Sequence, residues 1–221
     1  MWDNVRVIDK LGTDLTVVNS ARVSFAKYSK EFTSDDDGLI KFLAKNKHYS
    51  PFRHCLVQFH IKMPEFVARQ FYKHIVGSDY AFKDHAWNEI SGRYVKYNEI
   101  LWKPDYFRKK TDNIKQGSLD EKHEFSDYWL QVFDMKTKDL YDTYIKMVED
   151  GIPNEQARAI LPLNFYTEFY WTASLQAIQN FVVLRLDKHA QKEIRDYAIE
   201  IDKIMSDLFP VSWKYLMEFC K

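Results

Sequence analysis

The chain has 221 residues, and its 32 basic and 32 acidic side chains give it a formal net charge of zero. This balance gives no overall electrostatic reason to expect binding to nucleic acid or to a membrane surface, although it allows a local basic pocket. Hydrophobic residues make up 46% of the chain and aromatic residues 16%, which is typical of a globular protein with a substantial core. We expect a single domain over residues 1–221.

Cysteine content and the N-terminal sequence indicate the compartment. The two cysteines, Cys55 and Cys220, have no metal-type spacing, so we expect neither a disulfide framework nor a zinc site. The N-terminus has scattered charges and no apolar core of signal-peptide length. No apolar run approaches the roughly 20 residues that span a bilayer. We therefore expect a soluble, cytoplasmic protein, and its many aromatic residues suggest an oligomer.

The first third of the chain predicts alternating strands and helices. The expected elements are a strand at 5–9 ended by Gly12, a helix at 13–20, a helix from Ser34 through Lys47, a strand at 56–63 and a helix at 64–75. Strict alternation of polar and apolar residues predicts the strand at 56–63. Ser34 and the three aspartates after it are typical of a helix cap and first turn, an interpretation we favour over a metal site. On the helix at 64–75, Arg69 and Lys73 share a face, as do Gln70 and His74.

Helical spacing dominates the second half. We expect an irregular excursion at 102–117, a helix at 119–150 stopped by Gly151, a short helix from Pro153, a strongly apolar segment at 175–186 and an amphipathic helix at 189–209 ended by Pro210. Periodicity allows either a strand or a packed helix at 165–173.

Arg185 is the most unusual residue, because its neighbours in Phe-Val-Val-Leu-Arg-Leu predict burial. A buried guanidinium needs acceptors, since leaving it unpaired costs several kcal/mol. An internal pair with Asp187 or Glu193 explains it as well as a ligand does. Arg158 raises the same question. Arg93 follows Ser91-Gly92, where a glycine lets the backbone approach a ligand closely.

Together these three arginines with Gln70, Lys73 and Ser91 would suit a phosphate and the polar edge of a base. Each arginine alone is more often part of a structural ion pair. The chain has no glycine-rich phosphate loop and no His-x-His or His-Glu-x-x-His motif. Cys55 begins an apolar strand, where a buried and inert thiol is the simpler interpretation. Chemistry at a carbon centre would therefore need a cofactor.

A helix containing Phe66-Val67-Ala68-Arg69-Gln70 is followed by Asn88-Glu89-Ile90-Ser91-Gly92-Arg93-Tyr94. These motifs resemble the flavin-dependent thymidylate synthases, whose mark is Arg-His-Arg, seven residues, then Ser-x-Arg. The likeness spans almost the whole chain, through residues 21–25, 48–52, 151–158, 161–164, 180–185 and 189–191. It implies a mixed α/β (α+β) fold with a mostly antiparallel central sheet packed with helices, and a homotetramer with shared active sites.

The resemblance also implies a reaction and a site. The reaction is the reductive methylation of dUMP to dTMP, with FAD as cofactor, methylenetetrahydrofolate as carbon donor and NADPH as reductant. The dUMP residues would be Gln70, Lys73, Glu89, Ser91, Gly92, Arg93, Arg158 and Arg185, with Arg158 from a neighbouring subunit. As the catalytic residue, Arg185 would contact the uracil edge and favour ionisation at N3, which increases the nucleophilicity of C5. The FAD residues would be Ser24, Ser50, Lys73, His74, Ile75, Glu89, Ser174, Gln176, Asn180 and His189.

Three features depart from the family pattern. The first half of the mark is Lys73-His74-Ile75, and fifteen residues rather than seven separate Ile75 from Ser91. The extra segment, within 76–87, contains four aromatic or imidazole side chains: Tyr80, Phe82, His85 and Trp87. Ser174 and Gln176 stand where the family usually has Asn and Arg. A related C5-modifying enzyme, such as a pyrimidine nucleotide hydroxymethylase, and a non-catalytic nucleotide-binding homologue are the alternatives.

Overall fold

The computed structural model describes residues 4–77, 85–110 and 118–220. The chain forms two compact units. Unit 1 contains residues 1–61, 72–88 and 170–221, and unit 2 contains residues 62–71 and 89–169. This division reflects compactness alone, so the single domain expected over residues 1–221 stays a prediction. No helix in the described ranges is long and apolar enough to cross a membrane.

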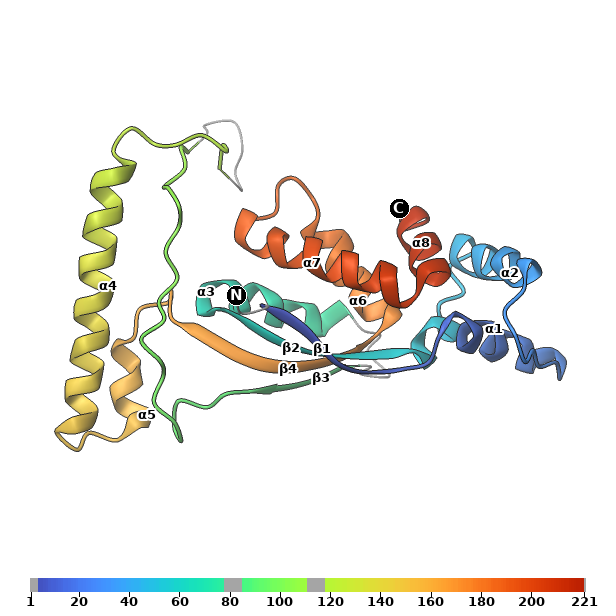
Figure 1. The fold of residues 1–221 in the computed structure, drawn as a ribbon, viewed down its shortest axis with the longest axis horizontal. Helices are drawn as coiled ribbons and strands as arrows, with labels where there is room; N and C mark the ends of the chain where they lie inside the picture. Colours follow the sequence, from blue (N-terminus) through green and yellow to red (C-terminus); the bar gives the residue numbers. More distant parts are fainter. Residues whose placement is uncertain (1–3, 78–84, 111–117, 221) are drawn as a thin grey trace. The chain divides into compact units, whose positions relative to one another are not determined.

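A four-stranded sheet runs through the described part of the chain in the order β1, β2, β4, β3 (Figure 1). Its strands are β1 (Val5–Leu11), β2 (Leu56–Pro64), β3 (His85–Glu89) and β4 (Tyr166–Ser174). β1 pairs with β2 in antiparallel register, with an irregularity between Val7 and Asp9. Buried and half-buried residues alternate along β2, as its sequence predicted. With its helices, the sheet confirms the mixed α/β fold.

The helices of unit 1 come from both ends of the chain (Figure 1). They are α1 (Asp14–Arg22), α2 (Ser34–Lys45), α6 (Leu175–Arg185), α7 (Lys192–Leu208) and α8 (Pro210–Glu218), with 3₁₀ turns at Val23–Phe25, Ser50–His54 and Tyr72–Gly77. The carboxylate of Asp14 accepts hydrogen bonds from the backbone N–H groups of Val211 and Ser212 at 3.1 and 2.8 Å. This contact joins the first turn of α1 to the first turn of α8.

The acidic run at the start of α2 has a structural role. Thr33 caps the helix, one residue earlier than predicted, and its N–H and hydroxyl donate to Asp36 Oδ2 at 2.7 and 3.0 Å. Asp36 is wholly buried and pairs with Arg22 at 2.7 Å. Asp37 accepts a hydrogen bond at 2.7 Å from the Tyr215 hydroxyl. Capping and packing therefore account for Asp36 and Asp37.

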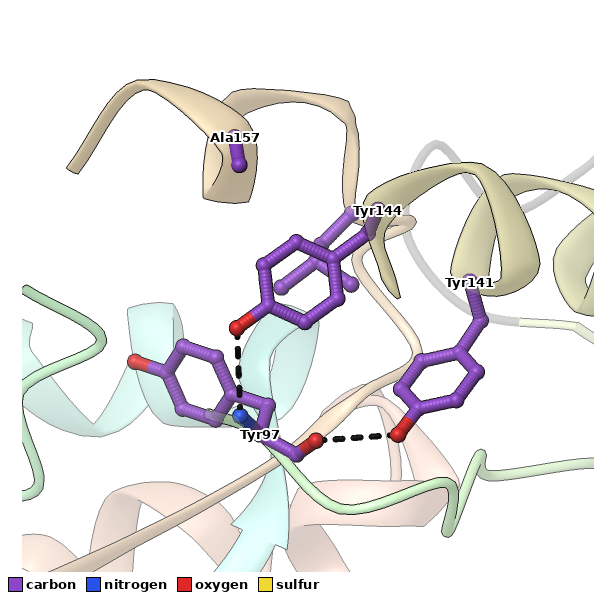
Figure 2. Packing of buried hydrophobic residues seen from close by; sticks show 5 residues of the cluster. Tyr97, Tyr141, Tyr144 and Ala157 are labelled. Atoms are coloured by element: carbon purple, nitrogen blue, oxygen red, sulfur yellow. Dashed lines mark hydrogen bonds between the residues drawn. The ribbon is translucent and has the colours of Figure 1, made fainter. Parts of the chain in front are cut away.

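Unit 2 contains the longest helix of the described chain. Its helices are α3 (Glu65–Phe71), α4 (Ser126–Glu149) and α5 (Asn154–Ala157), followed by a 3₁₀ turn at Arg158–Ile160. Gly151, with φ of +88°, follows the end of α4 as expected. Tyr141 and Tyr144 of α4 form a buried cluster with Tyr97, Ala157 and Leu161 (Figure 2). This cluster is the hydrophobic core of unit 2.

Several predicted boundaries are corrected. The helix expected at 64–75 is wrong beyond Phe71, because the chain tightens into the 3₁₀ turn that begins at Tyr72. In that turn Tyr72 packs edge-on against Trp87, with ring centres 4.8 Å apart. Pro64 is the last residue of β2 rather than the first of the helix.

Other elements differ in extent. The helix expected from residue 119 begins at Ser126, and the open choice at 165–173 resolves to the strand β4. The structure adds β3 and α8, which the sequence did not predict. Residues 102–110 lack regular structure, as expected, apart from an isolated bridge between Arg108 and Lys122. Residues 111–117 and most of the extra segment at 76–87 lie outside the described residues.

Candidate functional site

The predicted site residues fall into two groups, one in each unit. Unit 1 contains Ser24, Ser50, Lys73, His74, Ile75, Ser174, Gln176, Asn180, Arg185 and His189, and unit 2 contains Gln70, Glu89, Ser91, Gly92, Arg93 and Arg158. We call His74, Phe181 and Arg185 the Arg185 cluster. We call Ser91 to Tyr94 the Arg93 turn.

The Arg185 cluster joins α6 to the 3₁₀ turn Tyr72–Gly77. Arg185 Nε donates a hydrogen bond of 2.7 Å to His74 Nε2, across 111 positions of sequence. The His74 ring also lies edge-on to Phe181, with ring centres 5.0 Å apart. Phe181 and Arg185 are four residues apart and share one face of α6, so a single imidazole contacts both. The structure therefore brings together His74, which the resemblance assigns to FAD, and Arg185, which it assigns to dUMP.

The contact of Arg185 Nε differs from the carboxylate pair expected with Asp187 or Glu193, which stays a prediction. Asp187 accepts a hydrogen bond from the backbone N–H of His189 at 2.7 Å, and its Oδ1 lies 2.9 Å from the Nδ1 of that ring. The acceptor found for Arg185 Nε is an imidazole rather than a carboxylate. A neutral imidazole adds no negative charge to this contact, and an anionic ligand can replace the ring as acceptor.

His74 is neutral at physiological pH. Burial, with a smaller contribution from the charge of Arg185, lowers its pKa from 6.5 to about 4. Because Nε2 accepts from Arg185, the ring proton is on Nδ1. Burial also lowers the pKa of Arg185.

This histidine should make the protein less stable in acid. The unfolded chain binds a proton at His74 near pH 6.5, whereas the folded chain binds it only near pH 4, so the free energy of unfolding falls as pH drops through that window. We expect the melting temperature of His74→Asn to fall less than that of the wild type when the pH is lowered from about 7 to about 4.5. The exposed His54→Asn is the control and should follow the wild type. Parallel curves for His74→Asn and wild type would contradict the assignment.

The other predicted residues of unit 1 differ in exposure. Ser174 is wholly buried, and its hydroxyl accepts a hydrogen bond from the N–H of Ala177 at 3.2 Å, so it caps α6. Gln176 and Asn180 are half-buried and share a second face of α6. The exposed ones are Ser24, Ser50, Lys73 and His189, and the side chain of Ile75 lies outside what the structure describes. Their FAD contacts stay predictions.

The Arg93 turn follows the end of β3. Tyr94 N–H donates to Ser91 O at 3.0 Å, and the Arg93 guanidinium lies 5.0 Å from the centre of the Tyr94 ring. Arg93 also donates to the Tyr94 hydroxyl at 3.0 Å. Arg93 and Arg158 are both exposed, and neither pairs with a carboxylate in the described part of the chain. Among its described residues, unit 2 thus presents two guanidinium groups that do not pair with a carboxylate.

Two carboxylates lie close together in unit 2. Glu89 accepts a short hydrogen bond from the hydroxyl of Thr167, which is completely buried on β4. Burial, and then the negative charge of Glu89, raise the pKa of Glu65 from 4.5 to about 7, while Arg69 opposes the shift. The sequence did not single out Glu65 or Thr167, because neither stands in a recognisable motif.

Glu65 is expected to lower the free energy of unfolding as pH rises. Its folded pKa lies above its unfolded value, so its stabilising contribution is complete below about pH 4.5 and is lost as pH rises through about pH 7. We expect Glu65→Gln to raise the melting temperature above that of the wild type near pH 8, and to change it little near pH 5. The exposed Glu124→Gln is the control. An equal effect of Glu65→Gln at both pH values would exclude a raised pKa.

Proteins of known family are similar to this chain in sequence. A family model described as thymidylate synthase complementing protein matches residues 6–211. The flavin-dependent thymidylate synthase of Thermosipho melanesiensis is 38% identical over 216 residues, which cover 97% of this chain and 90% of the relative. The enzyme of the same description from Thermus thermophilus is 38% identical over 213 residues, covering 95% of this chain and 73% of the relative.

A solved structure has a similar fold. The UMP/dUMP methylase PolB from Streptomyces cacaoi, bound with 5-Br dUMP, matches with a TM-score of 0.84 at 25% sequence identity. The match covers 97% of this chain and 94% of that chain.

Proposed function

This chain belongs to the flavin-dependent thymidylate synthase family, and we propose that the Arg185 cluster and the Arg93 turn serve its reaction, the reductive methylation of dUMP to dTMP. As a member of that family, the protein is a FAD-dependent methyltransferase. The likeness to a UMP/dUMP methylase supports a pyrimidine nucleotide as substrate.

The observation that carries the substrate proposal is the pair of exposed guanidinium groups in unit 2. Arg93 and Arg158 have no carboxylate partner among the described residues, so their charges are available to a nucleotide phosphate. Arginine binds phosphate through two parallel N–H donors. We also assign Gln70, Lys73, Glu89, Ser91 and Gly92 to the dUMP contacts.

Arg185 would act on the uracil. Its guanidinium is half-buried, which strengthens its effect on a nearby charge. Beside a uracil oxygen it would stabilise the ring ionised at N3 and so raise the nucleophilicity of C5. His74, neutral and bonded through Nε2, orients this guanidinium without neutralising it.

Residues of unit 1 offer the donors that FAD needs. Lys73 is exposed and has no ion-pair partner in the described chain, so it can meet an anionic group. The amides of Gln176 and Asn180 supply both donors and acceptors. FAD would supply the hydride that reduces the transferred one-carbon unit, with methylenetetrahydrofolate as its donor and NADPH as the source of electrons. We also assign Ser24, Ser50, His74, Ile75, Glu89, Ser174 and His189 to this site.

We further propose a cytoplasmic homotetramer in which Arg158 serves a neighbouring subunit. Large exposed apolar side chains support association, since Val23, Phe25, Tyr28 and Tyr94 are between 70% and 77% exposed. The free cysteines Cys55 and Cys220 suit a reducing compartment. Burial raises the pKa of Cys55 to about 12, so this thiol is inert.

Mass spectrometry of the product tests the function. The protein is incubated with FAD, NADPH, methylenetetrahydrofolate and either dUMP or UMP, and we expect dTMP, with one CH₂ more than dUMP. A hydroxymethylated product would show the related C5-modifying reaction instead. No flavin absorbance after incubation with FAD and dUMP, together with no product, would exclude flavin-dependent methylation.

A further inference from the structure

A buried tyrosine lies directly against the Arg93 turn. Gly92 is buried, and a β-carbon added to it would lie 2.2 Å from Cε2 of Tyr97 and 3.0 Å from its hydroxyl oxygen. The φ angle of Gly92 is outside the left-handed region, so the position needs glycine for space rather than for backbone freedom. The Tyr97 ring therefore occupies the volume that any other side chain at position 92 would need.

Tyr97 is held in place by groups outside the turn. Its backbone N–H donates to the Tyr144 hydroxyl at 3.3 Å, and the Tyr141 hydroxyl donates to its carbonyl at 3.0 Å (Figure 2). Its ring packs against Phe165, with ring centres 4.6 Å apart. Only 8% of Tyr97 is exposed. Its position is therefore set by α4 and by the segment before β4.

The Tyr97 hydroxyl is influenced by charged groups that are assigned to the nucleotide. Burial is the largest influence on its pKa and raises it, and a hydrogen bond from the N–H of Gly92 lowers it. The charges that act on this pKa belong to Glu89, Arg158 and Glu65. Ala157, the residue before Arg158, packs in the same cluster as Tyr97 (Figure 2). One phenol thus contacts the turn and lies near both Glu89 and Arg158.

We propose that Tyr97 is a positioning residue for nucleotide binding, which fixes the Arg93 turn in the conformation that receives the anionic nucleotide. The ring excludes other conformations of the turn at Gly92, and the hydroxyl fixes the Gly92 N–H. A turn held in its bound conformation loses less conformational freedom when the nucleotide binds, which strengthens binding. This inference rests on the proposed function, because it requires dUMP as the ligand of the turn.

Tyr97→Phe tests the hydroxyl. The variant keeps the ring and both backbone hydrogen bonds, and it removes the acceptor of the Gly92 N–H. We expect the Kd and KM for dUMP to rise about fivefold to tenfold, the effect of losing one hydrogen bond. FAD affinity and kcat at saturating dUMP should stay at the wild-type values, because Tyr97 touches neither reacting group. Calorimetric titration and initial rates give the two measurements.

Tyr106→Phe is the control, since it removes a hydroxyl of unit 2 that bonds Asp120 at 3.0 Å and does not hold Tyr97. It should leave dUMP affinity unchanged. Wild-type affinity in Tyr97→Phe would overturn the proposal, and so would equal losses of affinity in both variants, which would indicate a general packing effect. If the wild-type protein binds no dUMP, the proposed function fails with it. Wild-type binding combined with unchanged Tyr97→Phe overturns the positioning role alone.

Discussion

Arg185→Ala is expected to abolish thymidylate formation and to weaken dUMP binding by about 1.5–3 kcal/mol, the scale of a hydrogen bond from a charged donor. The guanidinium is half-buried at the end of α6 and donates to an uncharged imidazole, so its positive charge remains in this contact. Removing it takes away the stabilisation of charge that develops on the uracil. Arg185→Lys keeps a charge but loses the planar fork, so it should bind dUMP better than the alanine variant and still turn over slowly.

Product formation and calorimetric dUMP binding measure these effects. Arg195→Ala on α7 is a suitable control, because its guanidinium bonds the carbonyl of Lys188 at 3.1 Å and has no assigned role in the site. That variant should keep wild-type turnover. Wild-type turnover in Arg185→Ala would remove Arg185 from the catalytic machinery, whatever its effect on binding.

Local pattern was enough for much of the fold. The alternation of polar and apolar residues placed β2 because one side of that strand is buried, and a glycine with positive φ marked the end of α4 at Gly151. The helix expected at 64–75 failed at Tyr72, where packing of Tyr72 on Trp87 and of His74 on Phe181 favours a tighter turn. Such contacts join residues far apart in sequence, and periodicity does not contain them.

In the candidate site too, local sequence pattern did not predict contacts between residues that are distant in the chain. The composition around Arg185 marked an arginine in need of acceptors, and one acceptor is His74, 111 positions away. Motifs identified Glu89, Ser91 and Arg93 because their spacing is fixed by one short turn. Thr167 and Tyr97 belong to other segments that reach this turn only after folding, so no local signal marked them.

Gly92→Ala is expected to weaken dUMP binding at least tenfold, about 1.4 kcal/mol or more. The added methyl group would lie 2.2 Å from Tyr97 Cε2, a distance that cannot persist. Tyr97 is held by Tyr141 and Tyr144, so the turn must move and carry Arg93 with it. The strain should also lower stability by about 1–3 kcal/mol, the usual cost of overpacking. Calorimetric titration with dUMP and thermal denaturation measure the two losses.

The double variant Gly92→Ala with Tyr97→Leu tests whether the loss of stability in Gly92→Ala comes from the steric clash with the Tyr97 ring. Leucine lacks the ring atoms that meet the new methyl group, so stability should recover relative to Gly92→Ala alone, although Tyr97→Leu by itself leaves a cavity and destabilises. Each change would then offset part of the other's cost, which a double-mutant cycle reports as a coupling energy. Gly38→Ala is the control, because its added methyl group meets nothing within 4 Å and lies in α2, where alanine is favoured over glycine. Additive losses in the cycle would show that the Tyr97 ring does not determine the residue at position 92.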